Sequence, residues 1–213
     1  MIHGLFEEGG RDVQLAPGAM LLRGFAEGVD AACLGALRRI VEVAPFRHMV
    51  TPGDHRMSAA MTNCGTVGWV TDRTGYRYDG HDPQTGLPWP AMPGILADLA
   101  AQAAAQAGFD DFTPDACLVN RYKPGARLSL HQDKDERDLS APIVSVSLGL
   151  PAVFLFGGMR RVDPKCRVSL SHGDVVVWGG PARLRYHGVL PLEPGHHPLT
   201  GGYRINLTFR RAA

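Results

Sequence analysis

The sequence is poor in cysteine and in net charge, and it has no long apolar run. The four cysteines, Cys33, Cys64, Cys117 and Cys166, lack the spacing of a metal-binding cluster, which indicates reduced thiols in a reducing compartment. Residues 1–8 are acidic and contain no apolar stretch, so we expect no signal peptide, no membrane contact and a cytoplasmic location. The formal net charge of +1 leaves a nucleic-acid partner open, because such a partner is bound by a local basic patch.

Length and composition predict a single domain over residues 1–213. A chain of 213 residues with 45% apolar content can bury one sizeable core, and no segment resembles a linker. Residues 1–112 are predicted to form an N-terminal extension with two helices and an irregular middle, and residues 113–213 a series of short strands. We therefore expect a mainly β protein with flanking helices (α+β), whose second half is a double-sheet jelly roll.

The expected elements follow from capping residues and from apolar periodicity. The first helix is predicted to start with Asp30 as its cap. The second is predicted to open at Pro93 and to end before Gly108. Strands are predicted over 117–122, 143–150, 152–156, 167–170, 174–178, 183–187 and 203–210.

Two histidines and one aspartate have the spacing of a metal site. On an extended strand His131 and Asp133 project from the same face, so both side chains can reach one ion. His187, in a segment that also resembles a short strand, is expected to supply the third ligand. Two imidazoles and a carboxylate suit Fe(II) in an oxygenase, but Zn²⁺ accepts the same ligands, so the triad alone leaves both open.

The C-terminal strand favours a site for a carboxylic acid. Residues 203–210 alternate apolar and polar side chains, which puts Arg204, Asn206 and Arg210 on one face. Arginine holds a carboxylate through two parallel hydrogen bonds, and a dicarboxylic acid that chelates iron at one end needs such a partner at the other. Asn120 and Tyr122, two residues apart on another expected strand, can add an amide and a phenol to the same pocket.

Together these motifs resemble the AlkB family of iron- and 2-oxoglutarate-dependent dioxygenases, which reverse alkylation damage in nucleic acids. The resemblance extends over nearly the whole chain, and no ligand or clamp residue is missing. It implies a double-stranded β-helix (jelly-roll) core, Fe(II) as the metal, and 2-oxoglutarate and O₂ as co-substrates. It also implies that the catalytic metal ligands are His131, Asp133 and His187. The residues expected to bind 2-oxoglutarate are Asn120, Tyr122, Arg204, Asn206 and Arg210.

Residues 46–90, which we call the lid, are expected to recognise the substrate. They carry several methionine and aromatic side chains, and unpaired or flipped bases stack on aromatic side chains. Taken alone, such residues are more often partly buried packing residues. The resemblance implies that Trp69 stacks on the base and that Tyr76 contacts the nucleotide backbone, and we include Tyr78 and Met61 among the substrate-binding residues.

Asp135 and Arg161 are the candidate substrate residues outside the lid. A base methylated on a Watson–Crick ring nitrogen is positively charged, and the carboxylate of Asp135, which we expect to be buried, would favour it over the normal base. Glu136 and the residues after it are interpreted as a solvated charged turn. Arg161 lies in a basic stretch after Gly157 and Gly158, where phosphates would find partners.

The sequence thus predicts oxidative demethylation of bases such as 1-methyladenine and 3-methylcytosine, a direct reversal of DNA damage that releases formaldehyde. DNA, favoured as a single strand, and also RNA are the expected partners of a monomeric enzyme. One alternative is an Fe(II)/2-oxoglutarate hydroxylase of a protein or small molecule. Another is a non-redox metal protein, such as a zinc hydrolase or a sugar-binding jelly roll.

Overall fold

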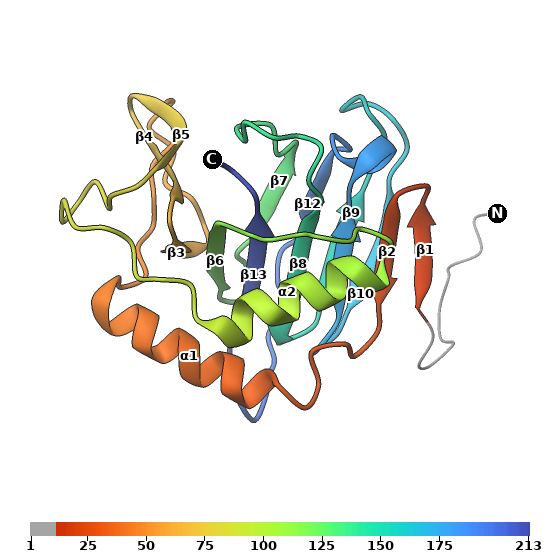
Figure 1. Ribbon diagram of the computed structural model, residues 1–213, viewed down its shortest axis with the longest axis horizontal. Coiled ribbons are helices and arrows are strands. Elements are labelled where there is room, and N and C mark those ends of the chain that lie inside the picture. The colour runs from red at the N-terminus through yellow and green to blue at the C-terminus, as the bar shows by residue number, and fades with distance from the viewer. Residues whose placement is uncertain (1–11) are drawn as a thin grey trace.

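The computed structural model describes residues 12–213, so the acidic segment 1–8 lies outside the described residues. Two helices pack on the outer face of a seven-stranded sheet, and a four-stranded sheet faces its other side (Figure 1). A two-stranded hairpin stands at one end of the sheets. Within residues 12–213, no helix is long and apolar enough to cross a membrane. The predicted fold class, mainly β with flanking helices, is confirmed.

The strands form a major sheet, a minor sheet and a hairpin. In spatial order, the seven-stranded major sheet consists of β1 (Val13–Ala16), β2 (Ala19–Leu22), β11 (Val175–Trp178), β8 (Ile143–Gly149), β13 (Arg204–Arg210), β6 (Ala116–Tyr122) and β3 (Ala60–Gly65). The four-stranded minor sheet consists of β10 (Cys166–Leu170), β9 (Ala152–Phe156), β12 (His187–Val189) and β7 (Leu128–His131). The hairpin is β4 (Gly68–Asp72) and β5 (Gly75–Asp79), and the helices are α1 (Asp30–Val43), α2 (Gly94–Gln106) and the short 3₁₀ helix η1 (Gly180–Ala182).

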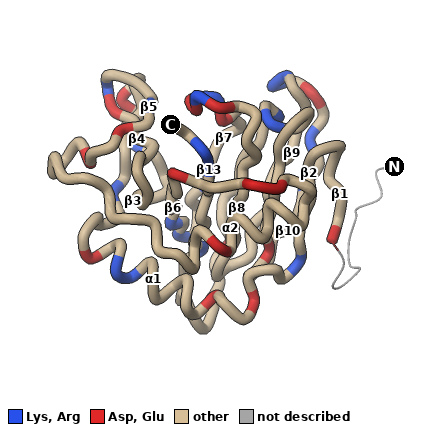
Figure 2. The backbone as a smooth tube through the Cα atoms, viewed as in Figure 1, with Lys and Arg blue, Asp and Glu red and all other residues tan. Residues whose placement is uncertain are grey.

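Alternation along the major-sheet strands produces two apolar cores, one on each face. The outer core packs helix residues such as Leu37 and Leu99 against strand residues such as Leu207. The inner core lies between the two sheets and includes Phe154 and Trp178. Many charged residues lie in the loops between the strands and along α1 (Figure 2). A charged residue on an inner strand is therefore exceptional and needs a partner or a ligand.

Strand β13 carries such residues. All seven of its side chains are buried, although every second one is polar. The apolar members join the outer core against the helices. The polar members consequently face the space between the two sheets, and they are Arg204, Asn206, Thr208 and Arg210.

The two predicted helices are present, but one predicted cap is wrong. Helix α1 buries Leu34 and Leu37 as its apolar face, and its N-cap is Val29, with no side-chain capping hydrogen bond. The carboxylate of Asp30 instead accepts a hydrogen bond from Nε2 of His172 at 2.8 Å. Because that partner comes from the distant turn before β11, local spacing could not reveal it.

The strand predicted over 183–187 is also wrong. The chain forms η1 around Pro181 and resumes as a strand only at His187. Arg183 is buried and donates hydrogen bonds to the carbonyls of Ala141 and Asp133, and this anchoring holds the segment away from a sheet. In addition, β1 to β5 lie in the half that was predicted to contain only helices and irregular chain. These strands are short, and β3 is buried at five of its six positions, so it shows no alternation.

Candidate iron centre and substrate cavity

The two histidines of the triad lie on neighbouring strands of the minor sheet. His131 ends β7 and His187 begins β12, and the two residues face each other directly in the β7–β12 pairing. Their ring centroids are 4.3 Å apart. A side chain at the next residue, Gly188, would place its Cβ 2.8 Å from the carbonyl oxygen of Leu128. Glycine at this position therefore lets the two strands approach closely beside the site.

Asp133 completes the triad from a loop. Strand β7 ends at His131, so the expectation that both residues share one strand is wrong. Oδ1 of Asp133 nevertheless lies 3.4 Å from Nε2 of His131 and 3.8 Å from Nε2 of His187. One ligand atom from each of the three side chains lies within 4.8 Å of the others, close enough for all three to bind one ion.

Backbone carbonyls orient both imidazoles. Nδ1 of His131 lies 2.9 Å from the carbonyl oxygen of Ser129, and Nδ1 of His187 lies 3.0 Å from that of Arg185. A carbonyl oxygen only accepts, so each Nδ1 carries a proton, and each Nε2 is the ring nitrogen left to face a metal. Such outer hydrogen bonds fix the tautomer that a metal requires.

The charges around the triad are balanced by Arg210. Burial by itself would raise the pKa of Asp133, but Arg210 and the two imidazoles hold that pKa well below its ordinary value. Burial, together with repulsion from His131, lowers the pKa of His187 to about 4. Burial opposes the charged form of His131 too, yet the hydrogen bond to Asp133 raises its pKa. Without a metal, Asp133 therefore stays a carboxylate and His187 a neutral imidazole at neutral pH, and His131 holds a second ring proton more readily than an ordinary histidine.

The triad opens into a cavity of about 830 Å³ between the sheets and the lid. Its walls include residues of both sheets, of β4 and β5, and of the loop after β7. All five residues predicted to bind 2-oxoglutarate line this cavity. So do five of the six residues predicted to bind substrate, namely Met61, Trp69, Tyr76, Asp135 and Arg161.

The inner end of the cavity fits a carboxylic acid. Among the described residues, the Tyr122 hydroxyl and the Nε and Nη1 atoms of Arg204 are buried without hydrogen-bond partners. Arg204 lies over the Tyr122 ring, 5.1 Å from its centroid, and its Nη2 donates to Oγ of Ser147 at 2.9 Å. Burial raises the pKa of Tyr122, so its hydroxyl stays a donor. Unpaired buried donors beside a buried cation are what the far carboxylate of 2-oxoglutarate requires.

Asn120, Asn206 and Arg210 lie between this end and the triad. The Asn206 amide donates to Oγ of Ser145 at 2.8 Å, and Oδ1 of Asn120 and Nη1 of Arg210 have no partner among residues 12–213. The other nitrogens of Arg210 bind Oδ2 of Asp133. Arg210 thus contacts a metal ligand, with one donor left for a bound molecule.

The lid places its aromatic side chains at the mouth of the cavity. Trp69 and Tyr76 stack with ring centroids 5.8 Å apart. Nε1 of Trp69 donates to Oδ2 of Asp135 at 2.9 Å. Met61 is fully buried on β3 and forms part of the floor. Tyr78 is the one predicted substrate residue that does not line the cavity. Its hydroxyl donates to Oε1 of Glu136 at 2.7 Å.

Asp135 and Glu136 have exchanged the environments that the sequence predicted. Asp135, expected to be buried, is exposed, whereas Glu136, expected in a solvated turn, is 7% exposed. Glu136 pairs with Arg183 at 3.0 Å and with Arg210 at 3.1 Å. The sequence predicted no role for either Glu136 or Arg183, because nothing in a run of charged residues indicates which of them meets distant arginines.

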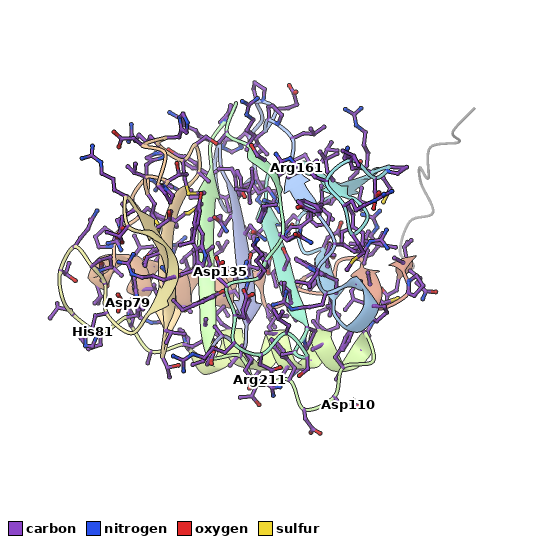
Figure 3. All side chains as sticks on the ribbon, turned by 90° about the horizontal axis from the view of Figure 1, so that it is seen from above. Asp79, His81, Asp110, Asp135, Arg161 and Arg211 are labelled. Atoms are coloured by element: carbon purple, nitrogen blue, oxygen red, sulfur yellow. The ribbon has the colours of Figure 1, made fainter. Side chains whose placement is uncertain are left out.

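Arg161 and its basic neighbours lie at the outer rim of the minor sheet. Nη1 of Arg161 donates to the carbonyl of Leu130, at 2.6 Å, on the strand that carries His131. In the view from above, Asp135 lies beside the lid hairpin and Arg161 lies away from it (Figure 3). Arg121, in contrast, packs between Phe46 and Tyr203 and does not line the cavity.

A facial triad of two histidines and a carboxylate, beside a buried carboxylate pocket in a double-sheet jelly roll, defines a mononuclear iron oxygenase. Residues 18–210 match the model of the 2OG-Fe(II) oxygenase superfamily. The chain is 61% identical over 199 residues to "Alpha-ketoglutarate-dependent dioxygenase AlkB" of Salmonella typhimurium, covering 93% of this chain and 92% of that protein. The chain therefore belongs to the AlkB family of 2OG-Fe(II) oxygenases.

Two further relatives extend the comparison. Human "Nucleic acid dioxygenase ALKBH1" is 34% identical over 127 residues, which is 59% of this chain and 32% of that protein. The solved structure "The structure of OsALKBH1" superposes with a TM-score of 0.81 at 30% identity, covering 94% of this chain and all of that chain. The family resemblance of the sequence motifs is confirmed. The protein is an Fe(II)- and 2-oxoglutarate-dependent dioxygenase, and the zinc hydrolase and sugar-binding alternatives are set aside.

Proposed function

We propose that this dioxygenase demethylates N-alkylated bases in DNA, such as 1-methyladenine and 3-methylcytosine, and thereby repairs them by direct reversal. The observation that carries the proposal is one cavity that joins the triad, a carboxylate pocket, a stacked aromatic pair and the exposed carboxylate of Asp135. The similarity to human "Nucleic acid dioxygenase ALKBH1" supports the same substrate class.

The inner half of the cavity would bind the metal and the co-substrate. Nε2 of His131, Nε2 of His187 and Oδ1 of Asp133 would hold Fe(II), and Arg204 with Tyr122 would bind the far carboxylate of 2-oxoglutarate. Asn120, Asn206 and Arg210 would line the rest of that molecule. When bound, iron supplies the oxidation of a C–H bond by O₂, with 2-oxoglutarate converted to succinate and CO₂.

The outer half would orient the damaged base. Trp69 and Tyr76 offer ring faces for stacking, and Met61 offers an apolar floor below them. Asp135 would exchange its hydrogen bond from Trp69 for one from the cationic base, and Arg161 would contact a phosphate at the rim. A hydroxylated N-methyl group is a hemiaminal: it leaves as formaldehyde, and the ring nitrogen keeps the bonding electrons, so the base is restored.

We further propose the finer properties that the sequence predicted. The lid, residues 46–90, recognises the substrate, and residues 113–213 form the catalytic core within one domain. A cytoplasmic monomer is proposed, acting on single strands of DNA and also on RNA. The three buried cysteines, all free thiols, support a reducing compartment, and the cavity mouth between lid and loops suits an extruded or unpaired base.

Mass spectrometry of a single-stranded oligonucleotide carrying one 1-methyladenine tests the function. With Fe(II), 2-oxoglutarate, ascorbate and air, the enzyme should remove one methyl group, and one formaldehyde should appear per base restored. The His131→Ala variant should leave the oligonucleotide unchanged. If the wild type forms succinate while the methylated base persists, the oxygenase chemistry stands and 1-methyladenine in DNA is not the substrate.

A further inference from the structure

The β4–β5 hairpin of the lid contacts two consecutive carboxylates of the catalytic core. Trp69 on β4 and Tyr78 on β5 face each other in the hairpin pairing. Nε1 of Trp69 donates to Asp135, and the hydroxyl of Tyr78 donates to Glu136. A directly paired couple of aromatic residues on the lid therefore contacts adjacent residues of the loop that follows the metal ligand Asp133.

Glu136 is the buried member of the two carboxylates. Its Oε1 accepts from the Tyr78 hydroxyl at 2.7 Å and lies 3.1 Å from Nε of Arg210. Its Oε2 accepts from Nη2 of Arg183 at 3.0 Å. Each oxygen of this buried carboxylate therefore has at least one hydrogen-bond donor, and two guanidinium groups balance its charge, which favours a rigid network.

The same two arginines hold the metal ligand. Arg210 donates to Oδ2 of Asp133 through Nε, at 2.9 Å, and through Nη2. Arg183 donates to the backbone carbonyl of Asp133 at 2.7 Å. With Oδ2 taken by Arg210, Oδ1 is the oxygen left facing the two histidines. Glu136 and Asp133 thus share both of their cationic partners.

We propose that Glu136 is a positioning residue that couples docking of the β4–β5 hairpin of the lid, through Tyr78, to the orientation of the iron ligand Asp133. When the hairpin undocks, Glu136 loses the hydrogen bond from Tyr78 and is held less rigidly. It then fixes the positions of Arg210 and Arg183 less firmly. Both arginines then hold Asp133 less firmly. The inference goes beyond the proposed function, because it concerns the lid and a metal ligand for whichever substrate the enzyme takes.

Reciprocity gives the proposal a measurable form. If metal binding stabilises the docked lid by some factor, the docked lid must raise metal affinity by the same factor. Tyr78→Phe removes one hydroxyl that lies against Glu136 and touches no metal ligand. Thr71→Val is the matched control, since it removes a buried hydroxyl of the same hairpin that donates to the carbonyl of Val50 instead.

Two readouts test this without any oligonucleotide, so a wrong substrate assignment would not affect them. The first is hydrogen exchange of the β4 and β5 amides, with and without Mn²⁺ plus 2-oxoglutarate. The second is the Kd of Mn²⁺, measured by electron paramagnetic resonance. In the wild type the metal should slow exchange in the hairpin. Tyr78→Phe should weaken Mn²⁺ binding about tenfold, the effect of losing one hydrogen bond to a charged group, and Thr71→Val should leave the Kd within about twofold.

A double-mutant cycle assigns the effect to Glu136. Glu136→Gln keeps the shape but removes the charge that both arginines bind, so it should weaken Mn²⁺ binding at least as much as Tyr78→Phe. Adding Tyr78→Phe to Glu136→Gln should then cause little further loss, because the two act through one pathway. Additive losses, an unchanged Kd in Tyr78→Phe, or equal losses in Tyr78→Phe and Thr71→Val would each overturn the proposal.

Discussion

The buried guanidinium of Arg204 allows binding and stability to be separated in one variant. Arg204 is 1% exposed, and its Nε and Nη1 have no partner among the described residues. Burial lowers its pKa, which shows how unfavourable the site is for a charge. Arg204→Met removes the cation and keeps an unbranched apolar stem against the Tyr122 ring.

The expected loss of 2-oxoglutarate binding follows from the two free donors. A hydrogen bond to a charged group contributes about 1.5–3 kcal/mol. Two such bonds to one carboxylate therefore contribute roughly 3–6 kcal/mol, which corresponds to about 10²- to 10⁴-fold in Kd. The metal site should be unaffected, because Arg204 contacts none of the three ligands.

The ligand-free protein should respond in the opposite sense. Arg204→Met loses the hydrogen bond to Ser147 and the packing on Tyr122, about 1 kcal/mol each. It also removes two unsatisfied buried donors, each costing about 1–3 kcal/mol. The net change is therefore a gain of about 0–4 kcal/mol. We expect unfolding without ligand at the wild-type Tm or up to about 16 °C above it, since about 1 kcal/mol shifts the Tm of a protein of this size by about 2–4 °C.

Thermal denaturation with Mn²⁺, with and without 2-oxoglutarate, provides the assay. Wild-type protein should gain stability from 2-oxoglutarate, and Arg204→Met should gain none at the same concentration. Tyr122→Phe, which removes only the hydroxyl, should retain a reduced gain. A ligand-free Tm several degrees below wild type, together with a preserved gain from 2-oxoglutarate, would show that Arg204 holds the fold rather than the co-substrate.

Three further predictions concern other parts of the molecule. Metal binding must displace the second ring proton of His131, whose pKa is raised despite its burial. The affinity for Mn²⁺ should therefore fall about tenfold for each pH unit below that pKa. An affinity that does not change between pH 7 and pH 5 would contradict the placement of this proton on His131. Cys166 is the exposed thiol, and burial raises the pKa of Cys33 to about 11, so a thiol reagent should modify one cysteine per native molecule and four after denaturation. Asp135→Asn should lower kcat/KM about fivefold more for cationic 1-methyladenine than for an uncharged methylated base such as 3-methylthymine. The expected difference is modest because exposed charge pairs are weak. Equal losses for the two bases in a competition assay would show that Asp135 does not select the base.

The spacing of residue types along the sequence determined much of the local structure of this enzyme. Strand β13 alternates, so Arg204 and Asn206 share a face in any sheet that contains the strand. The two helices follow from apolar stripes and flanking breakers in the same way: α1 begins within one residue of its predicted start, and α2 lies within one or two residues of its predicted bounds. The clamp could be proposed from sequence because Arg204, Asn206 and Arg210 alternate along one strand, whereas His187 joins His131 and Asp133 only through the pairing of β7 with β12.

Only the tertiary structure decided which charges are buried. Asp135 and Glu136 are chemically alike and adjacent, yet one is exposed and the other is enclosed by two arginines. Arg183 reaches Glu136 across 47 residues, and Tyr78 does so across 58. Burial of a charge is stable only where such partners converge, and their convergence depends on how η1, the hairpin and β13 pack together. The sequence by itself therefore determined the chemistry of the site, and the packing of distant segments decided what holds that chemistry in place.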